Sequence, residues 1–375
     1  MKAQIRIGDK WIGEPKKCFV VAEAGSNHNG NLELGKKLIE AAKECGCDAI
    51  KFQAFKTENL VTKKADKAEY QKGKSTGRSQ FEMLKDLELS IEERHAFIEY
   101  AKGVEIPIFY SVFDQDSADS IEEMGIEIFK LGSGELTNIP LIKHIAQKGK
   151  PVIISTGMGT DEEISDAVAA FKEEGNEQLL LMNCSTGYPS RLEDANLRRV
   201  AYLKKKFNVV CGNSDHTEGI LVSVVAAALG IPLIEKHFTL DKMLLGPDHF
   251  VSMDPAEMKE LCSIIRIVEK NPVGEESLNE TLRRINIKII QKEIPIILGC
   301  GDRILSESEK RQRVWARKSL VAAKDIKRGE ALTKDNVSVK RPEEGILPKY
   351  YEKVLNRETK CVIKEGTSIK WEMLD

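Results

Sequence analysis

The sequence lacks several features that mark whole classes of protein. No apolar run approaches the roughly 20 residues that a membrane helix needs. The stretch from Met1 to Lys10 has no apolar core of the kind found in signal peptides. The formal net charge is only −2 over 375 residues, so no general attraction to nucleic acid or to an anionic membrane is expected. We therefore expect a cytoplasmic protein that acts on small molecules.

The eight cysteines contain no Cys-x-x-Cys pair, so a cysteine zinc site is not indicated. They form no paired framework either: Cys45 and Cys47 are two positions apart, and Cys184 and Cys211 fall in or beside expected strands. Reduced, mostly buried thiols are expected. Hydrophobic residues make up 41% and charged residues 31%, the balance of an ordinary soluble protein.

The first two thirds of the chain contain eight short apolar runs, each followed by a helical pattern. These runs are the expected strands, at about 19–24, 49–54, 108–112, 128–131, 152–155, 179–183, 209–212 and 233–237. Parallel strands that alternate with helices close into a barrel, and such a barrel collects its active site from the carboxyl ends of its strands. The sequence therefore predicts an α/β fold, a TIM (βα)8 barrel, together with the location of its site.

Local signals place some of the helices. Helices are expected from about Leu34 to Cys45 and from Pro255 to Glu269, the second closing the barrel. Another is expected to begin near Ser90, where Glu93 completes a capping box.

Three segments depart from the repeat. The stretch 56–80, rich in Lys, Ser, Thr and Gly, follows a strand and is interpreted as a lid or substrate loop, with a solvated insertion as the alternative. The stretch 271–302 is not assigned a structure. From Val314 onward, short β-like pieces between Gly, Pro and Asn predict a small β-rich module. The expected division is a barrel at 1–285, a linker at 286–311 and a module at 312–375.

Two lysines at strand ends indicate an anion site. Lys51 and Gln53 share one face of a strand, which in a barrel leads inward. Lys130 runs into a small-residue stretch containing Ser133, and Ser155 ends the next strand in the same way. Small residues let backbone amides and hydroxyls approach an anion. A lone buried lysine is more often an ion-pair partner, but this convergent set predicts a site for a phosphate and a carboxylate.

Acid, base and metal chemistry are indicated at other strand ends. Glu23 ends an apolar strand, where a carboxylate is a candidate base, or else a structural acceptor of backbone hydrogen bonds. His216 and His237 end adjacent strands and suit Mn²⁺ or a similar divalent ion, with water and substrate completing the coordination. Asp248 follows in a loop placed to hold sugar hydroxyls. Three further histidines, His28, His95 and His144, are interpreted as structural or exposed, or as shaping a turn.

The ordered motifs resemble those of the sialic acid synthase family, which condenses phosphoenolpyruvate with an amino sugar. The resemblance covers almost the whole chain and runs through Ala22-Glu-Ala-Gly-x-Asn-His-Asn-Gly, Lys51-Phe-Gln, Ser79-Gln-Phe-Glu-Met-Leu-Lys, Gly132-Ser-Gly-Glu, Ser155-Thr-Gly-Met, Tyr188-Pro, Ser214-Asp-His, Glu235-Lys-His-Phe-Thr-Leu-Asp and Gly246-Pro-Asp-His. The C-terminal part, with Ala316-Arg-Lys-Ser and Lys340-Arg-Pro, is similar to the antifreeze-like (SAF) domain of that family. A free-standing antifreeze protein is disfavoured by the barrel that precedes this module.

The resemblance implies a role for each matching position. The phosphoenolpyruvate site would comprise Lys51, Ser111, Lys130, Ser133, Ser155, Thr186 and Ser214. The sugar would contact Gln53, Tyr188, Asp248, Trp315 and Arg341. His216 and His237 would bind the metal, Mn²⁺ first and Mg²⁺ or Co²⁺ next. Arg341, and an aromatic residue at Trp315, would come from a neighbouring subunit, which implies a domain-swapped homodimer.

The implied reaction is N-acetylneuraminate synthesis from phosphoenolpyruvate and N-acetylmannosamine by C–O cleavage. Glu23 would position or deprotonate water, and Lys51 and Lys130 would supply fixed charge. Alternative acceptors are a 2,4-diacetamido-trideoxy sugar, which gives legionaminic acid, and a phosphorylated sugar; pseudaminic acid synthesis and a non-catalytic binding barrel are weaker alternatives. Two departures from the family pattern are Tyr110-Ser-Val-Phe-Asp, which lacks a proline, and a long connector at 271–297.

Overall fold

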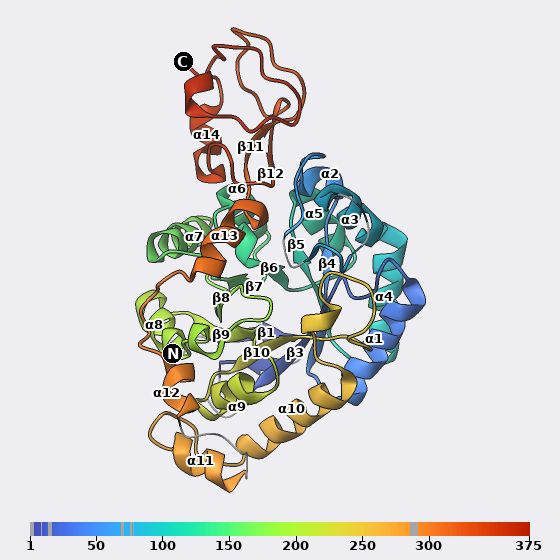
Figure 1. Ribbon diagram of the computed structural model, residues 1–375, viewed down its shortest axis with the longest axis vertical. Helices are drawn as coiled ribbons and strands as arrows, with labels where there is room; N and C mark the ends of the chain where they lie inside the picture. The colour runs from blue at the N-terminus through green and yellow to red at the C-terminus, as the bar shows by residue number, and fades with distance from the viewer. Residues whose placement is uncertain are drawn as a thin grey trace.

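Eight parallel strands form a closed barrel in the order β10-β3-β4-β5-β6-β7-β8-β9, so the predicted TIM-barrel fold is confirmed (Figure 1). The computed structural model describes residues 4–375 except 9, 14–16, 69–70, 76, 78 and 286–291. The barrel strands are β3 (Phe19–Gly25), β4 (Ala49–Ala54), β5 (Ile108–Val112), β6 (Phe129–Leu131), β7 (Val152–Ser155), β8 (Leu179–Cys184), β9 (Val210–Asp215) and β10 (Leu233–His237).

Helices surround the barrel and cover its outer face (Figure 1). They are α1 (Leu32–Glu44), α4 (Ile91–Gly103), α5 (Gln115–Glu123), α6 (Ile139–Ala146), α7 (Asp161–Glu173), α8 (Arg198–Phe207), α9 (Leu221–Ala228) and α10 (Pro255–Val268). The predicted capping box at Ser90 and Glu93 is present at the start of α4. All seven residues of β3 are buried, because parallel barrel strands are covered on both faces. This double burial is why the strands appear as continuous apolar runs in the sequence.

A short antiparallel hairpin at the amino end of the barrel was not expected. It consists of β1 (Ile5–Ile7) and β2 (Lys10–Ile12), and Ile5, Ile7 and Ile12 join the main hydrophobic core. Lys10 pairs with Asp48 at 2.6 Å, next to the start of β4. The described residues of this N-terminal segment therefore contribute to the hydrophobic core.

The 56–80 segment, where described, is packed against the barrel. It begins with α2 (Thr57–Leu60) and leads into α3 (Gln80–Leu87), which starts at the cap residue Ser79. Leu60, Val61, Met83, Leu84 and Phe113 belong to a separate hydrophobic cluster. Burial of Leu60 and Val61 in this cluster argues against a purely solvated insertion.

The unassigned stretch 271–302 contains two short helices in its described part. These are α11 (Leu278–Arg284) and α12 (Glu293–Leu298), and α12 buries Ile294, Ile297 and Leu298 against the main core. The proposed linker at 286–311 thus begins outside the described residues, then contains α12 and the first half of α13 (Glu307–Ala316).

The C-terminal module has a hydrophobic core of its own. It contains the antiparallel pair β11 (Ser319–Ala322) and β12 (Val337–Lys340), followed by α14 (Tyr351–Val354). Its core includes Leu320, Ile326, Leu332 and Ile363, the last of which forms an isolated bridge with Ile326. Figure 1 shows the module at one end of the molecule, with α13 between it and the barrel.

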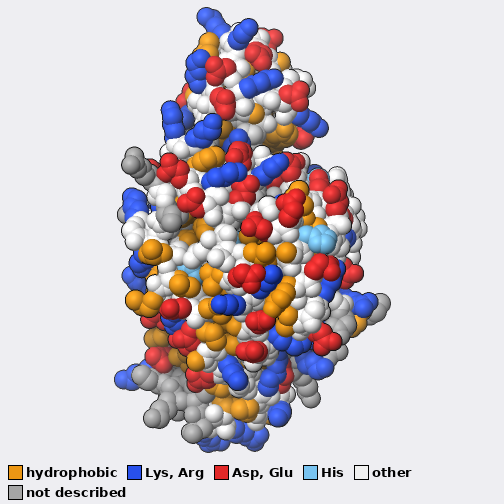
Figure 2. All heavy atoms as spheres, turned by 90° about the vertical axis from the view of Figure 1, so that its right-hand side faces the viewer, with side chains coloured by type: hydrophobic (Ala, Val, Ile, Leu, Met, Phe, Trp, Pro, Cys, Tyr) orange, Lys and Arg blue, Asp and Glu red, His pale blue; other side chains and the backbone are white. Residues whose placement is uncertain are grey.

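The surface is consistent with a chain of nearly balanced charge. Figure 2 shows Lys and Arg side chains intermixed with Asp and Glu over the visible face. Within the described ranges, no helix has both the length and the apolar character needed to cross a membrane.

Candidate active site

One cavity opens at the carboxyl ends of the barrel strands, and every candidate site residue from the sequence lines it. These residues are Glu23, Lys51, Gln53, Ser111, Lys130, Ser133, Ser155, Thr186, Tyr188, Ser214, His216, His237, Asp248, Trp315 and Arg341. Strand alternation explains much of this convergence, because residues two apart share one face. Lys51 and Gln53 on β4 face the cavity together, as do Glu235 and His237 on β10.

Four buried charges form the floor of the cavity. Lys51 forms an ion pair with Glu23 and donates a hydrogen bond to the Ser111 hydroxyl at 2.7 Å. Lys130 pairs with Glu235 at 3.0 Å, and Lys51 lies 3.7 Å from the other oxygen of that carboxylate. The lysines predicted to hold substrate anions are therefore already oriented by two carboxylates of the protein itself.

The two glutamates have different acid strengths although both are buried. Burial raises the pKa of Glu23 to about 7, against the partial opposition of Lys51. Burial also acts to raise the pKa of Glu235, but Lys130 and Lys51 outweigh it and lower that pKa to about 2. Environments that separate the pKa values of two carboxylates give them separate roles. Glu23 can exchange a proton near neutral pH, whereas Glu235 is a permanent anion.

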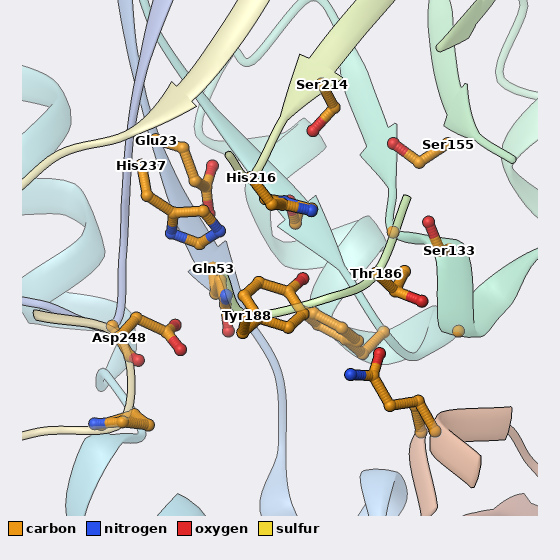
Figure 3. A pocket seen from close by; sticks show the side chains of 18 of the residues that line it. Glu23, Gln53, Ser133, Ser155, Thr186, Tyr188, Ser214, His216, His237 and Asp248 are labelled. Carbon is orange, nitrogen blue, oxygen red and sulfur yellow. The ribbon is translucent and has the colours of Figure 1, made fainter. Parts of the chain in front are cut away.

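Several hydroxyls face the cavity from the opposite side (Figure 3). The Ser155 and Thr186 hydroxyls are buried and have no hydrogen-bond partner within the described chain. Ser214 donates to Glu235 at 3.0 Å, and Ser133 accepts a hydrogen bond from the Gly157 amide at 3.1 Å. A buried hydroxyl without a partner is costly unless a ligand supplies one. This side of the cavity is therefore suited to an oxyanion ligand.

His216 and His237 lie next to each other, with ring centroids 5.2 Å apart (Figure 3). The Nδ1 of His216 donates to the Ser185 carbonyl at 2.6 Å, which leaves the Nε2 lone pair available. The Nδ1 of His237 is buried without a partner among the described residues. Burial, followed by the charge of His216, holds the pKa of His237 well below its ordinary value, so this imidazole is neutral.

This donor set fits a divalent ion with only two protein ligands. Apart from the segments that the structure does not describe, no group of three or more His, Cys, Asp or Glu side chains could enclose a metal. Water and substrate oxygens would therefore complete the coordination, as expected for Mn²⁺ or a similar ion at an open site.

The remaining polar side chains lie close to the histidines and to Glu23 (Figure 3). The Tyr188 ring lies 4.5 Å from that of His216 and 5.9 Å from that of His237, measured between centroids. Burial raises the pKa of Asp248 to about 6. A Cβ placed on Gly25 would lie 3.0 Å from the Glu23 carboxylate and 3.3 Å from the Gln53 amide. Glu23 and Gln53 thus converge on one point, which a glycine leaves open.

Some cavity residues were missed at the sequence level. They are Gln71 of the 56–80 segment, Cys184 at the end of β8, Glu235 on β10 and Gln312 on α13. Glu235 carried a usable signal, because it precedes His237 by two positions on an expected strand and so shares its inward face. Gln312 carried none, because its position depends on how a distant helix packs.

Arg341 reaches the cavity of its own chain in this structure, whereas the sequence placed it in the neighbouring subunit. Its backbone bonds to the end of α2 and the residues just after it. The Arg341 N–H donates to the Leu60 carbonyl at 3.0 Å, and the Thr62 N–H donates to the Arg341 carbonyl at 3.1 Å. Its guanidinium lies 5.5 Å from the centroid of the Phe113 ring.

A buried ion pair reinforces this docking. Lys318 of the module lies 3.1 Å from Glu135, and both side chains are essentially inaccessible to solvent. Lys318 also donates to the backbone carbonyl of Phe113. The module therefore bonds directly to the loops that follow β5 and β6.

Comparison with known proteins gives a consistent result over the whole chain. The NeuB family model matches residues 38–276, and the SAF domain model matches residues 317–375. The chain is 39% identical to the N,N'-diacetyllegionaminic acid synthase of Legionella pneumophila, covering 98% of each. It is 31% identical to human N-acetylneuraminate-9-phosphate synthase, covering 98% of this chain and 95% of the other. The crystal structure of the Bacillus subtilis spore coat polysaccharide biosynthesis protein SpsE superposes with a TM-score of 0.81 at 30% identity, covering 100% and 99%.

Proposed function

Because the chain belongs to the NeuB family, we propose that it is a transferase that condenses phosphoenolpyruvate with an N-acyl amino sugar to form a nonulosonic acid. The observation that carries the proposal is the convergence on one cavity of an acid–base carboxylate, Glu23, two lysines and two adjacent histidines. Relatives at 31–40% identity over nearly the whole chain are named as synthases of such acids.

Phosphoenolpyruvate would bind between the lysines and the hydroxyl side of the cavity. Lys51 and Lys130 would stabilise its charges as fixed cations, and Ser155 and Thr186 would donate the hydrogen bonds that they lack in the free protein. A Schiff-base mechanism is disfavoured for Lys51, because Glu23 and Glu235 outweigh its burial and raise its pKa.

The bond changes follow from the chemistry of an enol phosphate. Carbon 3 of phosphoenolpyruvate forms a bond to the aldehyde carbon of the open-chain sugar, and the aldehyde oxygen takes up a proton. Water adds to carbon 2 as Glu23 accepts one of its protons. The C–O bond to phosphate then breaks, phosphate departs with the bonding electrons, and the second water proton is lost as carbon 2 becomes a carbonyl.

His216 and His237 would hold the metal beside this reacting centre. A divalent ion bound there supplies Lewis-acid polarisation of the aldehyde oxygen. The histidines would contribute ring-nitrogen donors, and the ring of His216 is oriented by the Ser185 carbonyl.

We propose N-acetylmannosamine as the acceptor, giving N-acetylneuraminate. Tyr188, Asp248 and Gln53 would contact its hydroxyl and acetamido groups, and Arg341 would reach the N-acyl end. A 2,4-diacetamido-trideoxy sugar is the second candidate, because relatives named as N,N'-diacetyllegionaminic acid synthases share 39–40% of their residues with this chain.

The decisive experiment measures phosphate release from phosphoenolpyruvate with Mn²⁺ and one acceptor at a time. The acceptors are N-acetylmannosamine, its 6-phosphate and the 2,4-diacetamido sugar, with a chelator as control. We expect chelator-sensitive release with N-acetylmannosamine. In ¹⁸O-labelled water, C–O cleavage places the label in the sugar acid and none in phosphate. Release with another acceptor would replace the sugar assignment, and no release with any of them would contradict the proposal.

We further propose that two chains exchange their C-terminal modules to form a homodimer. A swapped module makes the same contacts in trans that it makes within one chain, so the cavity would keep its composition. A Glu23→Ala chain mixed with an Arg341→Ala chain should then regain activity in verified mixed dimers. Absence of rescue would show that each chain completes its own site.

A further inference from the structure

The turn that follows β7 contains a residue in an unfavourable conformation. Met158 has a φ of 57°, in the left-handed region that non-glycine residues rarely adopt. Met158 also lines the cavity, three residues after Ser155. A methionine side chain offers no local hydrogen bond to offset this strain, so other parts of the molecule must maintain the conformation.

Side chains of α13 and of the residues on either side of it bind three backbone groups of this turn. The Met158 N–H donates to Glu309 Oε1 at 3.0 Å. The Met158 carbonyl accepts from Arg317 at 2.8 Å and from Arg313 at 3.2 Å. The Gly159 carbonyl accepts from Arg303 at 2.8 Å. The turn is thus fixed by residues of the C-terminal part of the chain, which lie outside the barrel strands.

The residues that hold the turn are themselves buried and ion-paired. Glu309, 2% exposed, lies 2.7 Å from Arg303. Arg317 is fully buried and donates to both carboxylate oxygens of Glu163, at 2.8 and 3.1 Å. Glu163 also completes the capping box of α7, the helix that starts directly after the turn. Paired charges with this geometry keep few alternative positions.

On the cavity side, the same turn contacts the hydroxyl face of the site. The Gly157 amide donates to the Ser133 hydroxyl at 3.1 Å. A Cβ on Gly157 would approach Thr186 Cγ2 to 2.6 Å and Ser133 Oγ to 2.7 Å, so the backbone itself fills this space. The Ser133 hydroxyl is therefore held by this turn, which follows Ser155 directly in the chain.

We infer that Glu309 and Arg317 are positioning residues for phosphoenolpyruvate: by holding the Met158 peptide groups, they set the turn that follows Ser155 and that binds the Ser133 hydroxyl, and both hydroxyls would face the phosphate. This inference rests on the proposed function. It gives α13 a role at the phosphoenolpyruvate side of the cavity, while Arg341 of the same C-terminal region would reach the sugar, so docking of this region shapes both substrate sites.

The test measures binding of phosphoenolpyruvate to the full chain by calorimetry, with Mn²⁺ and without acceptor. Glu309→Ala should weaken binding about tenfold or more, because a small displacement of binding groups has a large effect. The KM for acceptor should change less than the KM for phosphoenolpyruvate. Lys310→Ala is the matched control, since Lys310 is an exposed neighbour on α13 that pairs with Glu307.

A double-mutant cycle separates positioning from general stability. Glycine adopts positive φ without strain, so Met158→Gly should keep the turn in place without the bonds from α13. Glu309→Ala should therefore weaken phosphoenolpyruvate binding less in the Met158→Gly background than in the natural chain. Arg317→Lys, which keeps the charge but loses the paired hydrogen bonds, serves as the second variant if Glu309→Ala does not fold.

Equal effects of Glu309→Ala in both backgrounds, or binding within about twofold of the natural chain for a folded variant, would overturn the inference. Binding of phosphoenolpyruvate to the natural chain distinguishes failure of the positioning role from failure of the proposed function. If it binds phosphoenolpyruvate and the variants bind equally well, only the positioning role fails. If the natural chain does not bind phosphoenolpyruvate, the proposed function itself is contradicted, and the positioning role with it.

Discussion

Glu235 accepts a hydrogen bond from Lys130 at 3.0 Å, at the centre of the cavity floor. Its second carboxylate oxygen lies 3.7 Å from Lys51, so one side chain orients both lysines. The cations of the site are therefore arranged before any substrate enters, which reduces the reorganisation needed when an anion binds.

Glu235→Gln is expected to destabilise the protein in a pH-dependent way. The pKa of this carboxyl falls from 4.5 to about 2 in the folded chain, so its ionised form stabilises the fold by about 3 kcal/mol. That contribution is complete above pH 4.5 and is lost as the pH falls through about 2. Denaturant unfolding should show a deficit for the variant that shrinks below pH 4.5. A deficit independent of pH would indicate that lost packing, not charge, is responsible.

The rate should depend on pH through Glu23. Its pKa of about 7 means that the carboxylate needed to accept a proton from water is depleted in acid. We expect kcat/KM to rise as the pH rises through about 7. Glu23→Gln should remove this acidic limb and lower the rate by about 10²- to 10⁴-fold.

Protonation of Glu23, which lowers the rate, should instead stabilise the folded chain. The folded chain holds this proton more tightly than the unfolded chain, so this contribution to stability is complete below pH 4.5 and lost as the pH rises through 7. If kcat/KM of Glu23→Gln still falls at acidic pH, the pH dependence of the rate belongs to another group.

His237→Ala is expected to weaken metal binding, because it removes one of only two histidine donors at the site. Mn²⁺ titrations followed by electron paramagnetic resonance should show an affinity lower by about tenfold or more, with metal-dependent turnover lost. His95→Ala is the control, since His95 lies exposed on α4. Unchanged Mn²⁺ affinity in His237→Ala would remove this residue from the metal site.

Gly134→Ala should disturb docking of the C-terminal region. A Cβ at this position would lie 2.5 Å from the carbonyl oxygen of Ala316 and 3.7 Å from the Arg341 guanidinium. We expect faster proteolysis between barrel and module and a higher KM for the acceptor. Gly103→Ala is a matched control, because a Cβ there meets nothing within 4 Å. Equal behaviour of the two variants would show that the close approach at Gly134 is not needed.

The sequence predicted the barrel well because its signal is local. Strands β4, β5, β7 and β10 have the predicted boundaries, since buried parallel strands are apolar along their length. Strand β9 extends to Asp215, three residues beyond its predicted end. Its last residues are polar because they carry the site, so hydrophobicity alone ends the strand too early.

The parts that could not be predicted depend on contacts between distant segments. The pattern places Glu23 and Lys130 at strand ends, but it cannot show that Glu235 pairs with both lysines. Nothing near Met158 in the sequence indicates that Glu309 binds its amide, about 150 residues further along the chain. The position of Arg341 at its own barrel is likewise a result of docking.

The barrel closes where β10 pairs with β3, and in that pairing His237 lies directly opposite Glu23. The candidate base and a candidate metal ligand therefore face each other across the seam of the closed sheet. During synthesis, the side of β3 that pairs with β10 stays without its partner strand until β10 has left the ribosome. The pairing of Glu23 with His237 therefore forms in the same step that completes the barrel, and a nascent chain stopped before residue 237 would lack both.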